Sequence, residues 1–167
     1  IISNPTSFHL ETALKLSPFV KGILMEKPLS NSLAGVDELI KLIKKNDNIF
    51  FMGHNLMFHP IISNIKEFIN SNELGRMINI QSQVGHWLPD WHPYENYKES
   101  YFAKKELGGG VALTLIHEIH MAIELAGRPL EVCGMRSESS LLDVNKDIDV
   151  ISDVMIKHNS GCVSQIH

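Results

Sequence analysis

Three short apolar runs that alternate with amphipathic segments constrain the fold of this chain most. The runs lie at 1–2, 22–25 and 49–53, and each precedes a segment with helical periodicity, at 6–17, 36–43 and 60–69. Parallel strands that are buried on both faces have continuous apolar sequences, and helices connect them. The order strand then helix, repeated three times, predicts a parallel sheet with helices on both faces, as in the second half of a doubly wound α/β fold.

Serine, asparagine, proline and glycine residues set the expected ends of these helices. Ser7 is placed to cap the first helix, and Ser30 and Asn31 are cap candidates for the second, because such side chains accept hydrogen bonds from free backbone N–H groups. Pro60 suits the first turn of the third helix, and Gly75 is expected to stop it.

The pattern changes after Gly75, where we expect a second domain to begin. Positions 78, 80, 82 and 84 alternate as in a half-buried strand, and residues 86–106 predict a long loop. A helix is expected at 110–126, and strands at 130–138, at 148–156 and after a turn at 159–161. The chain starts without Met on one strand and stops within another, so we expect it to be part of a longer protein.

Charge and composition narrow the classes of partner. The net charge of -4 is spread along the chain, without the basic patch that nucleic acid or an anionic membrane requires. No apolar stretch reaches the roughly 18 to 20 residues of a membrane helix. Cys133 and Cys162 form neither a disulfide framework nor a metal motif. We therefore expect a cytoplasmic protein that binds a small molecule, with no nucleic acid or membrane partner.

The first candidate site lies where predicted strands leave the parallel sheet. Glu26, Lys27 and Pro28 follow the second apolar run, and open α/β sheets bind ligands at this rim. A lysine there can donate to a substrate hydroxyl or, if desolvated, help to move its proton. The segment 4–9 occupies the same rim one strand earlier. Surface turns are the alternative interpretation of both segments.

A second candidate is the histidine pair on the helix expected at 110–126. His117 and His120 are three residues apart and share one helix face, whereas the zinc signature places its histidines four apart. No third ligand is identifiable, so we predict no metal site and favour a single catalytic histidine. A packed, hydrogen-bonded helix histidine is the alternative.

The order of the motifs is more specific than any one of them. The chain contains Asn-Pro-Thr-x-x-His from residue 4, Glu-Lys-Pro-Leu from 26, Gly-His-Asn-x-x-Phe-x-Pro from 53, Leu-Gly-Gly-Gly from 107 and His-Glu-Ile from 117. This series resembles the glucose-fructose oxidoreductase/inositol dehydrogenase family (Gfo/Idh/MocA) over nearly the whole chain. The segment 87–93 resembles a branch of that family associated with surface-sugar pathways.

The resemblance implies two partial domains: a dinucleotide-binding Rossmann domain at 1–75, and a substrate-binding and oligomerisation domain with an open, mostly antiparallel sheet at 76–167. It also implies an oxidoreductase that acts on a hydroxyl or carbonyl of a sugar or cyclitol with NAD or NADP, and that forms a homo-oligomer.

The resemblance also assigns roles to individual residues. Lys27 and His117 would be catalytic. The cofactor would contact Asn4, Pro5, Thr6, His9, Glu26, Lys27 and Pro28, and the peptide before Pro28 would be cis. The substrate would contact Lys27, Asn55, Trp91, Tyr97, Thr114 and His117.

Some positions depart from the family pattern. Many relatives have an aspartate within one turn before the helix histidine, where this chain has Leu113 and Thr114, and a hydroxyl cannot replace that base. His120 and Met57 also differ from the residues common in relatives. The 167 residues contain no Gly-x-Gly-x-x-Gly turn for the pyrophosphate. A non-catalytic binding module of the same fold is therefore the main alternative, and a histidine-based metal hydrolase ranks last.

Overall fold

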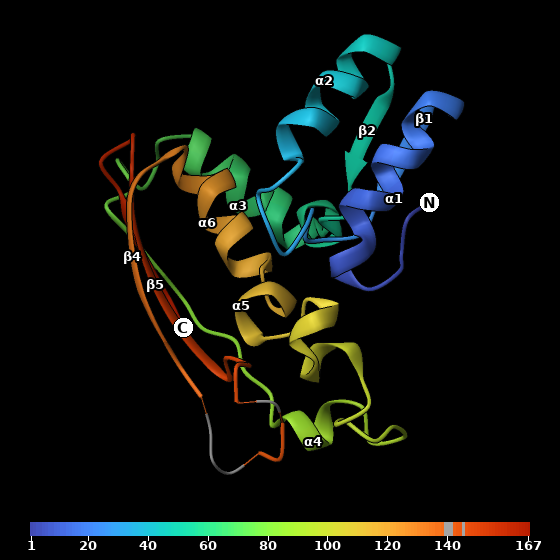
Figure 1. Ribbon diagram of the computed structural model, residues 1–167. Coiled ribbons are helices and arrows are strands. Elements are labelled where there is room, and N and C mark those ends of the chain that lie inside the picture. The colour runs from blue at the N-terminus through green and yellow to red at the C-terminus, as the bar shows by residue number, and fades with distance from the viewer. Residues whose placement is uncertain (139–141, 145) are drawn as a thin grey trace.

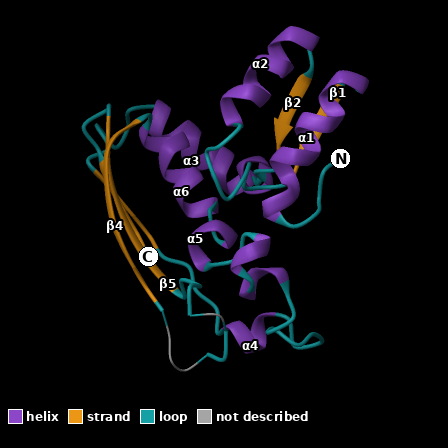
Figure 2. Ribbon diagram, in the orientation of Figure 1, coloured by secondary structure: helices purple, strands orange, loops and turns teal. Residues whose placement is uncertain are grey.

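The computed structural model describes residues 1–138, 142–144 and 146–167 and contains two sheets. The small parallel sheet and its helices occupy one end of the molecule, and the four-stranded sheet lies along the opposite side (Figure 1). Helices α3 (Pro60–Asn70), α5 (Val111–Thr114) and α6 (His117–Ala126) lie between the two sheets (Figure 2). The predicted α/β class is confirmed.

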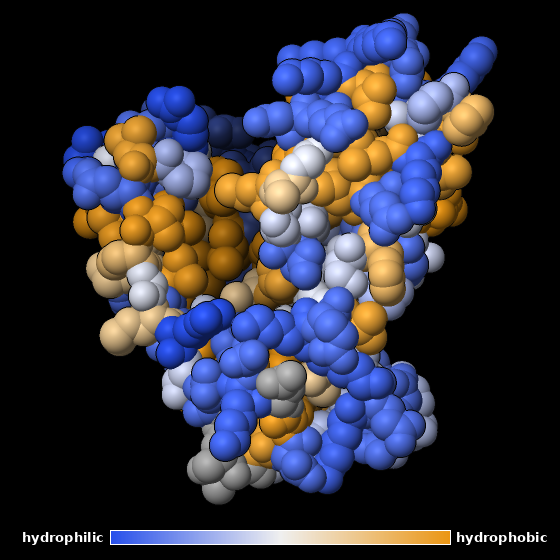
Figure 3. Space-filling model, in the orientation of Figure 1, coloured by the Kyte–Doolittle hydropathy of each residue, from blue (hydrophilic) through white to orange (hydrophobic). Residues whose placement is uncertain are grey.

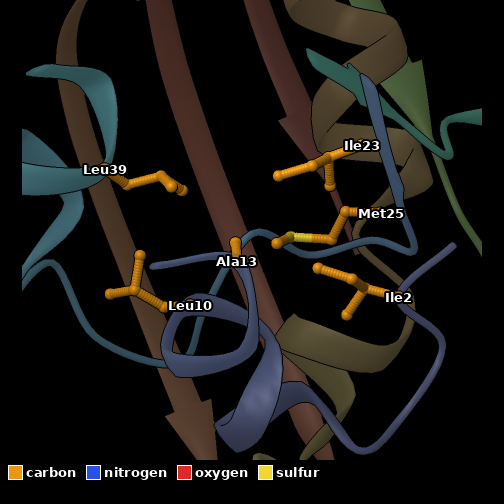
Figure 4. Packing of buried hydrophobic residues seen from close by; sticks show 6 residues of the cluster. All are labelled: Ile2, Leu10, Ala13, Ile23, Met25 and Leu39. Carbon is orange, nitrogen blue, oxygen red and sulfur yellow. The ribbon is translucent and has the colours of Figure 1, made fainter. Parts of the chain in front are cut away.

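The N-terminal part has the predicted parallel strands, but its first two helices pack on the same face of the sheet, and Leu24 and Phe51 on the other face are exposed. Strand β1 (Gly22–Met25) pairs in parallel with β2 (Ile49–Met52), and Ile2 adds a single parallel bridge on the other side of β1. Helix α1 (His9–Leu16) and helix α2 (Val36–Asn46) cover this sheet, with short 3-10 turns at Thr6–Phe8 and Ser17–Phe19 flanking α1. Figure 4 shows the resulting core, in which the buried side chains are Ile2, Leu10, Ala13, Ile23, Met25 and Leu39.

Three of the four predicted helix ends are wrong. The N-cap of α1 is Phe8, and the Ser7 hydroxyl is buried without a hydrogen-bond partner among the described residues. Helix α2 starts after Gly35, whose φ of 87° lies in the left-handed region, so Ser30 and Asn31 precede the helix by several residues. Pro60 does occupy the first turn of α3, but that helix ends at Asn70 instead of continuing to Gly75. Of the four predicted ends, only the start of α3 at Pro60 is correct.

The C-terminal part contains the predicted open, mostly antiparallel sheet. Its strands are β3 (Asn79–Ser82), β4 (Pro129–Ser137), β5 (Ile151–His158) and β6 (Val163–Ile166), in the spatial order β3-β6-β5-β4. The β4–β5 and β5–β6 pairs are antiparallel, and β3 pairs with β6 in parallel. Ala122 of α6 packs on Ile156 and Ile166, so the central helices cover the inner face of this sheet.

Three element predictions in this part need correction. The helix expected at 110–126 is broken into α5 and α6, because Leu115 leaves the helical region with a ψ of 38°. The strand expected at 148–156 begins only at Ile151, and Ile148 is buried outside it. The long loop at 86–106 contains helix α4 (Leu88–Trp91) and the 3-10 turn Tyr101–Ala103, and a second 3-10 turn, Lys105–Leu107, ends just beyond it.

Hydrophobic surface gathers on the upper two lobes of the molecule in Figure 3, whereas the lobe that carries α4 is mostly hydrophilic. Exposed apolar side chains on β2 include Ile49 and Phe51. Within the described ranges, no helix has the length and hydropathy that crossing a membrane requires.

Candidate functional site

The geometry around Lys27 begins with the end of strand β1. Lys27 is half-buried, and its ammonium donates a hydrogen bond of 2.6 Å to the backbone carbonyl oxygen of Thr114, at the end of α5. The peptide between Lys27 and Pro28 is cis, as predicted. One hydrogen bond thus joins the end of a parallel strand to the break between α5 and α6, two segments 87 residues apart.

The loop at residues 4–9 lies beside Lys27. The two ring nitrogens of His9 lie 2.7 Å from the carbonyl oxygens of Asn4 and Pro28, so this buried ring ties the loop to the turn that carries Lys27. A cavity of about 180 Å³ opens between them. Its walls are formed by residues 3–6, His9, Glu26, Lys27 and Tyr101.

Close packing against the glycine-rich segment fixes this loop. A Cβ atom at Gly108, whose φ is 82°, would lie only 2.7 Å from Thr6 Cβ. A Cβ at Gly109 would lie 2.4 Å from the carbonyl oxygen of Phe102. Glycine is therefore required at both positions if the loop and the 3-10 turn are to approach the start of α5.

Three histidines gather on the other side of Lys27. His54, after β2, stacks on His120 of α6 with ring centroids 3.6 Å apart and planes inclined by 4°, and it meets His117 edge-on at 6.2 Å. The Nδ1 atom of His54 is buried and has no hydrogen-bond partner among the described residues. The motif that contains His54 and the motif that contains His117 therefore form one cluster.

Burial makes this region favour uncharged groups. It lowers the pKa of His54 from 6.5 to about 4, with further lowering by His120, His117 and Lys27. It also lowers the pKa of His117, where Lys27 acts in the same direction and Glu26 opposes it. The pKa of Lys27 is lowered by burial as well, against the opposing charges of Glu26 and Glu118. The neutral imidazole of His117 thus lies within electrostatic range of the partly desolvated ammonium of Lys27.

The predicted cofactor and catalytic residues fall into one region. Asn4, Pro5, Thr6, His9, Glu26 and Lys27 line the cavity at Lys27, and Pro28 is buried next to it. The carboxylate of Glu26 lies over Gly53, where a Cβ atom would be 3.1 Å from Oε1. His117 is linked to this group by its electrostatic interaction with Lys27.

The predicted substrate residues separate into two groups. Thr114 and Trp91 line a second, larger cavity. Asn55 is exposed at the start of the 3-10 turn Asn55–Phe58, and Tyr97 is half-buried in the loop after α4. Neither of them lines either cavity.

Sequence reasoning missed two residues at the site. Tyr101 lines the cavity at Lys27, and burial followed by the charge of Glu26 raises the pKa of its hydroxyl. Asp149 accepts a hydrogen bond of 2.9 Å from the Ala112 N–H and lines the second cavity. Tyr101 belongs to a loop without a periodic pattern, so no sequence signal marked it. In the ranges that the structure describes, no cluster of three or more His, Cys, Asp or Glu side chains is arranged to hold a metal ion.

Comparison with known proteins supports the fold. Myo-inositol 2-dehydrogenase of Thermotoga maritima is 28% identical over 174 residues, which cover 99% of this chain and 48% of that protein. The structure of levoglucosan dehydrogenase in complex with NADH and levoglucosan matches 99% of this chain and 45% of that one, with a TM-score of 0.82 and 24% identity. Myo-inositol 2-dehydrogenase from Lactobacillus plantarum matches 99% of this chain and 48% of that one, with a TM-score of 0.81 and 22% identity.

The chain spans about a third to a half of the length of the curated relatives it matches. The family model for the GFO/IDH/MocA C-terminal domain matches residues 62–167, which include most of α3, helices α5 and α6 and the whole four-stranded sheet. The chain therefore belongs to the Gfo/Idh/MocA family.

Proposed function

We propose that this chain is part of an NAD(P)-dependent oxidoreductase that acts on a hydroxyl or carbonyl group of a sugar or cyclitol. The observation that carries the proposal is the position of Lys27, half-buried at the end of β1, bound to the Thr114 carbonyl and electrostatically coupled to His117. Dehydrogenases for inositol and levoglucosan among the relatives and similar structures indicate the substrate class.

The residues present fit one end of the cofactor. The cavity at Lys27 is small and lined by backbone and polar side chains of the 4–9 loop, and Tyr101 closes it. Asn4, Thr6, Glu26 and Lys27 would hold the nicotinamide end there, while a glycine-rich turn for the pyrophosphate is absent from these 167 residues. When bound, NAD(P) supplies the hydride acceptor or donor.

The side chains of this chain would then orient the substrate and move its proton. An ammonium has three donors, and Lys27 uses one of them on Thr114, so two remain for the substrate oxygen. His117 has a lowered pKa and is therefore neutral near pH 7, so it can accept the hydroxyl proton during oxidation and return it during reduction.

Binding of NADH and NADPH, followed through cofactor fluorescence, tests the proposal in the complete gene product and in the 167-residue chain. We expect the complete product to bind one of them and to reduce NAD or NADP in the presence of a sugar or cyclitol. Absence of cofactor binding by the complete product would contradict the proposal.

The alternative is a binding module that keeps the fold without the reaction. Thr114 favours it, because a hydroxyl stands where a carboxylate base is common in relatives. In that case the complete product would bind a sugar without oxidising it in the presence of either cofactor.

We also propose that copies of the protein associate through the outer face of the four-stranded sheet. Met135 of β4 is 77% exposed, and Met155 of β5 is 46% exposed and pairs with the exposed Cys133. A broad hollow that reaches from β4 to β3 includes both methionines. The two methionines lie among polar side chains such as Gln81, Asp153 and Gln165, and exposed methionines within a polar surround are frequent at subunit interfaces.

A further inference from the structure

His117, the proton acceptor of the proposed reaction, lacks the hydrogen bond that usually orients such a ring. A histidine that moves protons commonly has one ring nitrogen bound to a carbonyl or carboxylate oxygen, which fixes the ring and its tautomer. His117 is half-buried at the first position of α6, yet neither of its ring nitrogens has a hydrogen-bond partner within the described ranges. Packing must therefore hold this imidazole in place.

The packing contact comes from His54, which follows β2 by two residues. The ring centroids of His54 and His117 are 6.2 Å apart and the ring planes are inclined by 81°, an edge-on arrangement within the range in which aromatic rings attract each other. The backbone fixes His54, because its N–H donates to the Met52 carbonyl oxygen at 2.8 Å and its own carbonyl oxygen accepts from the Met57 N–H at 3.1 Å. A hydrogen-bonded turn thus presents the ring of His54 to α6.

His120 holds the same ring from a second position on α6. Its ring stacks on that of His54 with centroids 3.6 Å apart and planes inclined by 4°. His117 and His120 are three residues apart and share one face of the helix, so the single ring of His54 spans both. Glu124 anchors the stack, because its carboxylate lies 3.9 Å from His120 Nε2 and binds Lys66 of α3 at 3.0 Å. Burial lowers the pKa of His120, while Glu124 raises it and Lys66 lowers it.

Burial keeps these imidazoles uncharged near pH 7. It lowers the pKa of His54 to about 4. Burial is also the largest cause of the lowered pKa of His117, to which Lys27 and His120 add, while Glu26 opposes them. Water that reached the ring of His117 would weaken this largest effect, so a ring that excludes water from His117 also keeps it neutral.

We propose that His54 is a positioning residue for His117, whose flat ring holds the His117 imidazole beside Lys27 and excludes water from it. His54 itself exchanges no proton with the substrate. This inference rests on the proposed function, in which His117 accepts the hydroxyl proton, and it adds the residue that orients this acceptor.

The ring surface of His54, and not its nitrogen atoms, is the part that acts. A relay that passed protons through His54 would need hydrogen bonds at both ring nitrogens, but Nδ1 is buried without a partner among the described residues. The stacked face toward His120 carries no N–H group that could donate. Phenylalanine should therefore replace His54 without loss of its role, whereas alanine should not.

The titration of His117 gives a direct measurement, followed by NMR on the complete gene product with isotope-labelled histidine. In His54→Ala we expect water to reach the His117 ring and its titration midpoint to rise by about 0.5 pH unit or more. In His54→Phe the midpoint should stay within about 0.2 pH unit of wild type. If the alanine variant does not fold, His54→Gln, which fills the space without a ring, takes its place with the same expected rise.

His59→Ala is the matched control for a loss of stability alone. The side chain of His59 is exposed and accepts the Ile61 N–H at 3.2 Å at the start of α3. Its removal should weaken that helix end and leave the titration of His117 unchanged.

The pH dependence of turnover gives a second measurement, with a sugar or cyclitol that the wild type oxidises. In His54→Ala the acid limb of kcat/KM should move to higher pH by the same amount, and kcat should fall by about tenfold because the base is no longer held in place. His54→Phe should retain most of kcat and the position of the limb.

A His117 midpoint that is unchanged in His54→Ala would overturn the inference, as would a phenylalanine variant that shifts it as far as alanine does. Failure of the inference is separable from failure of the proposed function, because the NMR titration needs neither cofactor nor substrate. Turnover of a sugar by a protein whose His117 midpoint does not respond to His54→Ala would refute only the positioning role. The expected rise in a complete product that binds neither NADH nor NADPH would refute only the oxidoreductase.

Discussion

Replacement of Lys27 by methionine tests the central residue of the site. The substitution keeps the length of the side chain and removes the ammonium that donates to the Thr114 carbonyl. It also removes the charge that helps to keep the neighbouring His117 neutral. We expect turnover of a sugar or cyclitol substrate to fall by about 100-fold or more, within the usual range for loss of a proton-transfer group.

The expected loss of turnover and the expected change in stability follow from what the Lys27 ammonium contributes to the transition state and to the folded state. A 100-fold decrease corresponds to about 2.7 kcal/mol of lost transition-state stabilisation. The unfolding free energy should change by less than about 2 kcal/mol, because the unpaired Thr114 carbonyl is destabilising while removal of a partly desolvated charge acts in the opposite direction. The variant should therefore fold and lose activity.

The assay is the change in cofactor absorbance during steady-state turnover by the complete gene product, together with urea unfolding of the same samples. Lys15→Met is the matched control, since Lys15 forms an exposed ion pair with Glu11 and lies outside the site. Turnover by Lys27→Met within about threefold of wild type, with a substrate that the wild type oxidises, would refute the role given to the ammonium.

Three further predictions follow from the packing, the electrostatics and the exposed sheet. Gly109→Ala should lower the unfolding free energy by about 2 to 3 kcal/mol, because the new Cβ would meet the Phe102 carbonyl oxygen at 2.4 Å. Gly85→Ala is the control and should change the unfolding free energy by less than about 1 kcal/mol, because the space around Gly85 is open. Urea unfolding of both variants measures the two changes. The pKa of His54 is lowered from 6.5 to about 4, so the unfolded state binds more protons between these values and stability should rise with pH from 4 to 6.5. In His54→Gln this rise should shrink by about 1 kcal/mol after allowance for solvent screening, and an unchanged rise in pH-dependent melts would contradict the assignment. Met135→Asp should convert a homo-oligomer to monomers by light scattering, and an unaltered mass would argue against the proposed interface.

Periodicity and composition were sufficient for the architecture. Two of the three short apolar runs identified the parallel strands β1 and β2, and the run at 1–2 forms a single bridge. The apolar sequence did not show that only one face of this sheet is buried, with Ile23 and Met25 on that face and Leu24 and Phe51 exposed. The alternation after Gly75 identified the second, mostly antiparallel sheet, because one of its faces is covered by helices and the other is exposed. The ordered motifs also identified the family and placed Lys27 at the rim where β1 ends.

Local sequence was not sufficient for helix ends and breaks. Ser7 has the chemistry of a cap, but the packing of Thr6 against Gly108 leads the chain into a 3-10 turn, and the helix starts later. The apolar sequence 111–126 reads as one helix, yet the chain leaves the helical region at Leu115, next to the Thr114 carbonyl that binds Lys27.

The sequence by itself determined the fold class, the family and the position of Lys27 at the end of a parallel strand, because these depend on patterns within short segments. Only the tertiary structure decided which residues share a site. It joined Lys27 to Thr114 across 87 positions, stacked His54 on His120, and separated Trp91 from Asn55 and Tyr97. Such contacts depend on how distant segments pack, and no local periodicity encodes the distance between two side chains far apart in the chain.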